Sequence, residues 1–198
     1  REGVLEFARS CHNDEEHSCH VARIALVIFA ALADSCGFGN KERQILEAAA
    51  LLHDSGYFIS YREHHKHSYH LIRHADLFGF TPRERELIAQ IARYHRKALP
   101  KKKHEGFARL SPLDQLLVGR LGGILRLADG LDRRRAGMVT SIDCAPAPAT
   151  FMIRLHGDGD ISVELFGGKV KGDLFEAAFN TRLILVPAQT VGQLSAAG

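Results

Sequence analysis

The residues best suited to chemistry in this chain form an adjacent pair, His53-Asp54, at the end of an apolar, alanine-rich stretch. The stretch predicts a helix that begins before Leu46 and is stopped by Gly56. His53 follows Ala49 at i+4, so it should point inward. An imidazole and a carboxylate at a helix C-terminus suit a cation, which the partial negative charge of that end favours. A buried histidine capped by its neighbouring aspartate is the alternative interpretation.

Further candidate ligands occupy inward positions of other predicted helices. His20 heads an apolar stripe of a long helix near the N-terminus. His95 and Asp129 continue the apolar faces of helices whose starts are predicted at Thr81 and Ser111. A carboxylate on an apolar face is unfavourable unless something satisfies it. Together with the His-Asp pair, these residues predict one centre inside a helical bundle.

A histidine-rich segment between residues 64 and 74 follows the His-Asp pair. In a helix that starts near Lys66, His67 shares a face with the later histidines, whereas His64 lies on the approach to it. We expect one or two of these histidines to be ligands and the others to face solvent or support them. The choice lies among His64, His65, His67 and His70.

Imidazole and carboxylate ligands without thiolate suit Mn²⁺, Mg²⁺, Fe²⁺, Co²⁺ or Zn²⁺, and the pattern does not choose among these metals. A shared carboxylate such as Asp54 could bridge two ions. Such a centre activates water for attack on phosphorus, while nearby Lys and Arg hold the other phosphoryl oxygens. Asp54 and His53 are therefore the residues expected to carry catalysis.

The composition is that of an ordinary soluble protein, with 198 residues of which 45% are hydrophobic. The four cysteines stand apart without a C-x-x-C pair, which fits a reducing compartment, and we expect a cytoplasmic protein. The longest apolar run, residues 24–33, is much shorter than the roughly 20 residues of a membrane-spanning helix. No membrane association is expected.

Charge is unevenly distributed along the chain. Between Arg83 and Arg135 there are 14 Lys and Arg against 6 Asp and Glu, a balance of +8, although the whole chain carries only +3. This basic segment is either an anion-binding surface or a solvated face. Nucleic acid is not the expected partner, because no aromatic residues alternate with the basic ones and no recognisable motif is present.

Near residues 135–137 the sequence changes from helical periodicity to short β-branched or alternating runs. Short runs at 139–144, 149–156 and 161–166 predict strands, followed by a helix over 171–179 and a last strand at 182–186. The predicted fold is mainly α. Its parts are a helical domain over 1–136, a small α/β domain over 137–187 and a tail over 188–198.

The order His, His-Asp, His, Asp resembles that of the HD superfamily of metal-dependent phosphohydrolases. More closely, the segments LEAAALLHDSGYFISYREHHKHSYHLI, IARYHRKALPK and ILRLADGLDR look like the C-terminal region of the exopolyphosphatase/guanosine pentaphosphate phosphohydrolase family. The resemblance covers nearly the whole chain and implies an HD-type helical bundle followed by a small α/β domain. It also implies a set of metal ligands: His20, His53, Asp54 and Asp129 for the core pattern, and His95 with His67, or less so His64, for a second ion.

In that family this region is also similar to a polyphosphate-binding and dimer-forming surface. The resemblance implies five anion-binding candidates: Arg93, Arg96, Lys97, Lys101 and Arg126. An actin-like region precedes this one in the family and carries the polyphosphate-hydrolysing glutamate, and residues 1–5 look like the junction after it.

Two hypotheses follow. The chain is a metal-dependent phosphohydrolase that acts on a nucleotide or polyphosphate, or it is a non-catalytic polyphosphate-binding and dimerisation domain of a longer exopolyphosphatase. A homodimer is expected.

Overall fold

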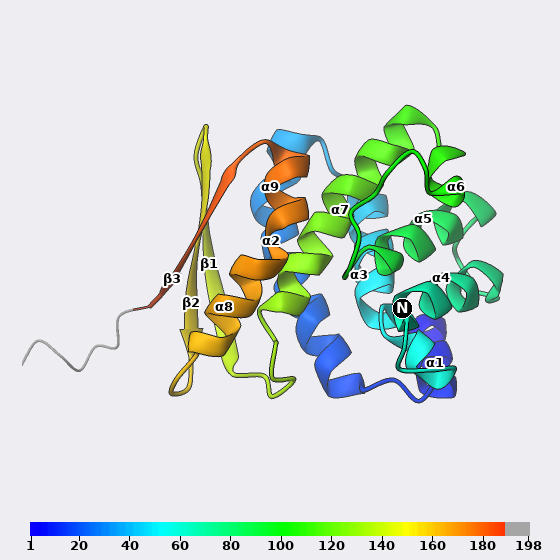
Figure 1. The fold of residues 1–198 in the computed structure, drawn as a ribbon, viewed down its shortest axis with the longest axis horizontal. Helices are drawn as coiled ribbons and strands as arrows, with labels where there is room; N and C mark the ends of the chain where they lie inside the picture. The colour runs from blue at the N-terminus through cyan, green and yellow to red at the C-terminus, as the bar shows by residue number, and fades with distance from the viewer. Residues whose placement is uncertain (189–198) are drawn as a thin grey trace, which may run out of the picture.

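The computed structural model describes residues 1–188, which fold into a bundle of helices with a three-stranded sheet at one end (Figure 1). The bundle comprises α1 (Glu2–Ser10), α2 (Glu15–Cys36), α3 (Asn40–Leu52), the 3₁₀ helix η1 (Ser55–Phe58), α4 (His64–His74), α5 (Pro82–Arg93), the short α6 (Glu105–Ala108) and α7 (Pro112–Gly130). The C-terminal part comprises β1 (Val139–Pro146), β2 (Thr150–Gly157), α8 (Ser162–Lys171), α9 (Asp173–Phe179) and β3 (Arg182–Pro187). The prediction of a mainly α fold followed by a small α/β unit is confirmed.

Local sequence sets the starts of three long helices. The Asp14 carboxylate accepts a hydrogen bond from the backbone N–H of His17 (3.1 Å) at the start of α2. Thr81 and Glu84 form a reciprocal capping box on α5, and the Ser111 hydroxyl accepts from the backbone N–H of Asp114 (3.1 Å) on α7. Each cap satisfies backbone donors that the helix itself leaves unpaired.

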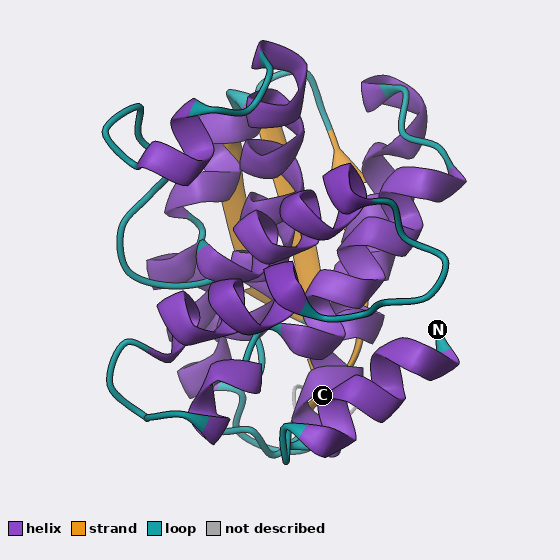
Figure 2. Cartoon of the chain, turned by 90° about the vertical axis from the view of Figure 1, so that its right-hand side faces the viewer, coloured by secondary structure: helices purple, strands orange, loops and turns teal. Residues whose placement is uncertain are grey.

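Helix α7 is the central element of the molecule. It contacts α2, α3 and α5 of the bundle and also α8 and α9 of the C-terminal part. Its residues Leu121, Leu125 and Ala128 are fully buried, as their i, i+4, i+7 spacing requires. Figure 2 looks onto the helical end of the molecule, with the sheet behind the helices. Because α7 contacts both the bundle and the C-terminal part, its side chains can meet residues of both.

The sheet has the order β1-β2-β3. β1 and β2 form an antiparallel pair in which Ile142 lies opposite Leu155, and β3 runs parallel to β2 with Leu185 opposite Ile153. A parallel pair needs a crossover connection, and α8 and α9 supply it. The sheet is held against the helices by contacts of β1 with α2 and of β3 with α8 and α9 (Figure 1).

The strand predicted at 161–166 is wrong, because these residues form the first half of α8. The Asp160 carboxylate accepts from the backbone N–H of Ser162 (2.9 Å) at the start of this helix. Glu164 is fully buried and accepts from the Arg134 guanidinium (Nε to Oε1, 3.0 Å). Arg134 lies 30 residues before Glu164 in the chain, so the alternating pattern at 161–166 could not indicate this contact. The other predicted strands are present, as is the helix predicted over 171–179, which begins at Asp173.

The chain passes from the helical part to the sheet between α7 and β1, close to the boundary predicted at residue 136. The division into two domains stays a prediction, since α8 and α9 both pack against α7. The predicted tail, 188–198, lies outside the described residues from position 189 onward.

Helix α2 is long and apolar enough to cross a membrane by length and composition. A single such helix is weak evidence for a span, because the core helix of a soluble protein meets the same criterion. In this structure α2 contacts α3, α7 and β1, and its residues Val21, Ile24 and Ile28 are fully buried. These contacts identify α2 as a core helix of the bundle.

Two adjacent glycines of α7 differ in how closely the C-terminal part approaches them. A Cβ on Gly123 would lie 2.9 Å from the Cα of Phe175 in α9, which is too close for a backbone atom. A Cβ on Gly122 would meet the side chain of Leu174 at 3.5 Å, an ordinary van der Waals distance. The close crossing of α7 and α9 therefore depends on Gly123 and not on Gly122.

We expect Gly123→Ala to lower the free energy of unfolding by about 1–3 kcal/mol, because α9 must move away from the new methyl group. Gly122→Ala is the matched control, and it should leave stability unchanged or raise it by up to about 1 kcal/mol through better helix propensity. Urea unfolding of the two variants beside the wild type measures both values. Equal effects of the two substitutions would contradict this account of the crossing.

Candidate metal centre

Four side-chain atoms from three helical regions converge at the centre of the bundle. They are Nε2 of His17 on α2, Nε2 of His53 and Oδ2 of Asp54 at the end of α3, and Oδ1 of Asp129 on α7. His17 lies 3.9 Å from Asp54 and 3.5 Å from Asp129, and His53 lies 3.5 and 3.9 Å from the same two oxygens. Ligands at about 2.1 Å from a tetrahedral metal are about 3.4 Å apart. The spacing thus suits the shell of one ion.

A second group adjoins the first through the other oxygen of Asp54. Oδ1 of Asp54 lies 3.3 Å from Nε2 of His64 and 3.6 Å from Nε2 of His95. The two imidazole nitrogens are 3.3 Å from each other. Both triads, His17-His53-Asp54 and Asp54-His64-His95, are buried and close enough to share an ion each. The Asp54 carboxylate therefore has the position of a bridging ligand between two sites.

Three of the imidazoles are fixed by a hydrogen bond on the opposite side of the ring. Nδ1 of His17 lies 2.7 Å from a carboxylate oxygen of Asp132. Nδ1 of His53 and Nδ1 of His95 lie 2.7 and 2.6 Å from the backbone carbonyls of Ala50 and Ala92. This is the arrangement that orients histidine ligands in metal proteins, with Nε2 directed at the ion.

Two buried imidazole nitrogens of the first group also have no hydrogen-bond partner in the described part of the chain. Nε2 of His17 and Nε2 of His53 are buried, and no hydrogen-bond partner is present for either among residues 1–188. Buried polar atoms are rarely left unpaired, so each requires an explanation. A cation coordinated by both atoms would provide one, and the residues present fit such an ion.

Burial and neighbouring charges hold His53, His95 and Asp54 in the forms that bind a metal. Burial lowers the pKa of His53 and lowers that of His95 well below its ordinary value, so both rings are neutral with a free lone pair. Burial alone would raise the pKa of Asp54, but the imidazoles of His53, His64 and His95 outweigh it and lower the pKa. At neutral pH Asp54 is therefore ionised beside the neutral rings of His53 and His95.

Each carboxylate also contacts a cationic side chain from outside the two triads. The Arg135 guanidinium donates to Oδ2 of Asp54 (2.6 Å), and the Lys171 ammonium donates to Oδ2 of Asp129. Burial would raise the pKa of Asp129, but the charge of Lys171 and the contact with His17 hold it well below its usual range. Lys171 belongs to α8, so the C-terminal part contributes directly to the centre.

Backbone contacts hold these elements in place. The Ser68 hydroxyl of α4 donates to the carbonyl of His53 (2.6 Å) and accepts from the backbone N–H of Gly56 (2.9 Å), which ties the His-Asp turn to α4. On the other side, Gly130 of α7 faces Gly167 of α8, where a Cβ on either would clash with the opposing backbone. That close crossing brings Lys171, one turn further along α8, to Asp129.

The two groups line a cavity of about 700 Å³. Six cationic side chains share this lining: Arg96, Lys97, Arg126, Arg133, Arg135 and Lys171. Lys97 and Arg135 have left-handed backbone angles, with φ of +61° and +56°. Such angles are uncommon for residues other than glycine and cluster at functional sites. The cavity therefore combines a candidate metal centre with a surface suited to anions.

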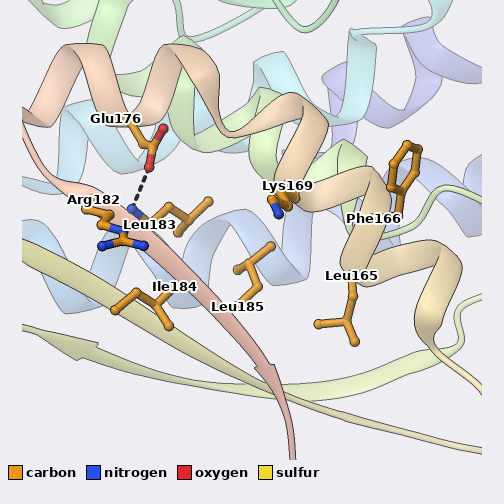
Figure 3. A pocket seen from close by; sticks show the side chains of 8 residues that line it. All are labelled: Leu165, Phe166, Lys169, Glu176, Arg182, Leu183, Ile184 and Leu185. Carbon is orange, nitrogen blue, oxygen red and sulfur yellow. Dashed lines mark hydrogen bonds between the residues drawn. The ribbon is translucent and has the colours of Figure 1, made fainter.

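Figure 3 shows a different hollow, between α8, α9 and β3. Its lining is mostly apolar, with Leu183, Ile184 and Leu185 on the strand. Its carboxylate, Glu176, already accepts from the backbone N–H of Leu183 (2.8 Å; Figure 3). This hollow has no group of metal-ligating side chains, unlike the cavity at the bundle centre.

Comparison with known proteins identifies the family. Residues 1–155 match the model of the Ppx/GppA phosphatase family, domain III. The chain belongs to this family. Among relatives named guanosine-5'-triphosphate,3'-diphosphate pyrophosphatase, the one from Pseudoalteromonas atlantica is 31% identical over 133 residues, and the one from Vibrio vulnificus is 33% identical over 127. These stretches cover 67% and 62% of this chain but only 26% and 24% of the relatives, so the chain spans about a quarter of their length.

The structure does not bring His20, the ligand expected on α2, into either group. The Ppx/GppA chain places His17, and not His20, in the first group; Nδ1 of His20 instead lies 3.2 Å from the Arg23 guanidinium. The stripe expected from His20 runs through Ile24, Val27 and Ala31; Ile24 is fully buried, but Val27 is 37% exposed. The buried stripe of α2 runs through Val21, and His17 precedes Val21 by one turn. His17, three residues before His20 on the same helix, was not among the expected ligands.

On α4 the structure favours His64, the expected alternative to His67. His64 joins the second group, whereas His67 belongs to neither group and is only half-buried. The helix begins at His64 and not near Lys66, so His64 occupies its first turn beside Asp54. Glu63, directly before it, has a left-handed backbone (φ +57°) that turns the chain into this start. The exact start of α4 was therefore the missing information.

The five expected anion-binding residues divide into two sets. Arg96, Lys97 and Arg126 line the cavity, although Arg126 is buried and already pairs with Asp173 (2.7 and 3.0 Å). Arg93 lies over the ring of Tyr69 instead, 5.3 Å from its centroid. Lys101 is exposed and Arg93 is half-buried, and neither residue lines the cavity.

The residues that sequence reasoning missed are His17, the carboxylate Asp132 and three cations, Arg133, Arg135 and Lys171. Arg133 and Arg135 belong to a run of arginines after α7 that could have been found by its charge, and Asp132 precedes them. Lys171 carried no such signal, because only the crossing of α7 and α8 brings it to Asp129.

Metal analysis of neighbouring histidine variants tests these ligand assignments. We expect about two divalent ions per chain in protein loaded with Mn²⁺ and then desalted. His17→Ala should lose the first ion and His64→Ala the second, because each removes a buried ligand. His20→Ala and His67→Ala, each three residues away on the same helix, are the controls and should retain both ions. Plasma mass spectrometry gives the ratio, and ion loss in a control variant would contradict the assignment.

The pH dependence of stability tests the charge of His17. Burial alone would lower its pKa, but contacts with Asp129 and Asp132 outweigh burial and raise the pKa from 6.5 to about 9 in the absence of metal. Because the folded pKa is the higher one, this stabilisation is complete below about pH 6.5 and is lost as the pH rises through about 9.

We therefore expect the metal-free protein to lose on the order of 2 kcal/mol between these pH values through His17. Urea unfolding in EDTA at pH 6.5, 8 and 9.5 measures it. The difference from His17→Gln isolates this residue from other groups that titrate in the same range. Parallel pH curves for the two proteins would contradict the raised pKa.

Proposed function

We propose that this chain is a metal-dependent hydrolytic module of a Ppx/GppA-family phosphohydrolase, acting on phosphoanhydride or phosphoester bonds. The observation that supports the proposal is the pair of buried ligand groups that share Asp54 inside a cationic cavity. The nitrogen and oxygen donors suit Mn²⁺, Mg²⁺, Fe²⁺, Co²⁺ or Zn²⁺.

In this proposal the protein residues have separate roles. His17, His53 and Asp129 hold one ion, His64 and His95 hold the other, and Asp54 is shared between them. The ions, when bound, supply a water of lowered pKa and withdraw charge from a phosphoryl oxygen. Arg135 orients the Asp54 carboxylate through its 2.6 Å contact.

The cations of the cavity rim bind the remaining phosphoryl oxygens. Lys97 and Arg133 are exposed, so an incoming anion can reach them, and Arg96 lies 3.1 Å from the ring of His64. Several positive charges around one cavity raise the local concentration of an anionic substrate and stabilise charge that develops on it. The substrate in this proposal is therefore a phosphate-rich anion, a nucleotide or a polyphosphate.

The alternative is a non-catalytic role, in which the same cavity binds polyphosphate and the chain pairs into a homodimer within a longer exopolyphosphatase. It is supported by the cationic side chains that line the cavity. A cytoplasmic location fits either role.

Replacement of the shared carboxylate separates the two functions. We expect Asp54→Ala to lower Mn²⁺-dependent phosphate release by about two orders of magnitude or more, because both ion sites lose a ligand. Asp76→Ala is the control, since the Asp76 side chain is 97% exposed and distant from the cavity lining. Phosphate release from inorganic tripolyphosphate and from a nucleoside triphosphate is measured with and without EDTA.

Unchanged turnover in Asp54→Ala would refute the hydrolytic role. Absence of turnover in the wild type, together with polyphosphate binding that weakens steeply with salt, would establish the binding role instead.

A further inference from the structure

Another hollow, of about 490 Å³, lies where the C-terminal part of the chain meets α2 and α7. Its lining comes from the end of α2, from Arg120 of α7, from the turn between β1 and β2, and from Phe179 and Thr181 around the end of α9. It shares no lining residue with the cavity at the bundle centre. Arg120 precedes Asp129 by nine residues, about 2.5 helical turns, so the two side chains leave α7 on opposite faces. This Arg120 hollow is therefore separate from the candidate metal centre.

The guanidinium of Arg120 is unpaired within the described part of the chain. Arg120 is half-buried, and its Nε is buried without a hydrogen-bond partner among residues 1–188. The guanidinium lies over the ring of Phe179, 5.9 Å from its centroid. Arg126, six residues further along α7, uses Nε and Nη2 to hold both carboxylate oxygens of Asp173 (2.7 and 3.0 Å). Arg120 can hold a ligand carboxylate in the same way.

A second polar group of the hollow is unpaired as well. Oγ1 of Thr181 is buried and has no hydrogen-bond partner among residues 1–188. Buried polar atoms are rarely left in this state, so the hydroxyl requires an explanation. The apolar part of the lining consists of Leu32, Pro146, Pro148, Phe151 and Phe179. Two unpaired polar side chains thus lie beside an apolar wall.

This combination matches the chemistry of a small organic carboxylate. A planar guanidinium binds both oxygens of a carboxylate, and a threonine hydroxyl can donate to one of them. Arg120 is the one cationic side chain among the described residues of this lining, whereas six line the cavity at the bundle centre. One guanidinium neutralises a single negative charge but not a chain of phosphates. The volume lies within the range of about 300–1,000 Å³ that small-molecule sites occupy.

We propose that the Arg120 hollow is a binding site for a small organic monocarboxylate. Arg120 and the Thr181 hydroxyl hold the carboxylate, and the apolar body of the ligand packs against Phe151 and Phe179. The site goes beyond the proposed hydrolytic function, because it requires neither the metal centre nor turnover.

A heteronuclear NMR titration with benzoate tests the proposal. Benzoate carries one carboxylate on an apolar ring, and benzyl alcohol carries the same ring without the charge. We expect benzoate to shift the backbone amide signals of Phe151, Phe179 and Thr181. It should bind about 10-fold more tightly than benzyl alcohol, because a hydrogen bond to a charged group contributes about that factor. Inorganic phosphate, which has no apolar body, should bind less tightly than benzoate.

Variants of the two polar residues identify the site. Arg120→Gln should weaken benzoate binding about 10-fold, because it removes the charge and keeps a polar side chain. Thr181→Val keeps the shape of the side chain and removes the hydroxyl, so it should weaken binding by a smaller factor. Arg154→Gln is the matched control, since Arg154 is exposed on β2 and does not line the hollow. The amide spectrum of each variant without ligand verifies that it is folded.

Equal affinity of the wild type and Arg120→Gln for benzoate would overturn the site. Equal binding of benzoate and benzyl alcohol would also overturn it, since only apolar contact would remain. Phosphate binding as tight as that of benzoate would refute the carboxylate class, and the absence of shifts with every probe would refute the proposal as a whole. Because the titration measures no phosphate release, its failure is distinguishable from failure of the hydrolytic role.

Discussion

Two buried carboxylates at the centre of the bundle impose the constraint on which the rest of the structure depends. Asp54 and Asp129 are almost fully buried, and a buried charge is unfavourable unless it is paired and hydrogen-bonded. Imidazoles surround both carboxylates, and a cation approaches each from the side. The helices must therefore meet at fixed positions, because each contributes a partner that the others require.

The C-terminal part is bound to the bundle by the same kind of interaction. Arg126 of α7 pairs with Asp173 at the start of α9, and Arg134, just after α7, pairs with the buried Glu164 of α8. Lys171 then reaches Asp129. Removal of one partner from a buried pair is costly, because the other charge remains in the interior. The small α/β unit thus stabilises the centre as well as covering it.

The centre and its cavity have the features that the proposed metal-dependent chemistry requires. Neutral imidazoles and ionised carboxylates are the forms that bind a divalent ion, and the opposite faces of three rings are already fixed by hydrogen bonds. The cations of the rim supply the charge that a phosphate-rich anion needs. Ligand orientation and anion binding are thus prepared by the protein itself.

Local sequence determined most of the helices and strands of this protein and part of its candidate centre. Helix caps at Thr81 and Ser111, apolar periodicity and the His53-Asp54 pair predicted the bundle and half of its centre, because each depends on residues within a few turns of one another. Likewise, the short apolar runs after residue 137, separated by Gly and Pro residues, predicted β1, β2 and β3.

Only the tertiary structure places His17 and His64, rather than His20 and His67, beside the buried carboxylates, and only it shows a helix in place of a strand from Ser162. In each case the alternatives have similar local preference, and the choice depends on which partner lies opposite. Asp129 and Asp132 select His17, Asp54 selects His64, and Arg134 selects the helical form of Glu164. These partners are 30 or more residues away in most cases, and their distance in the fold is not encoded by any short pattern.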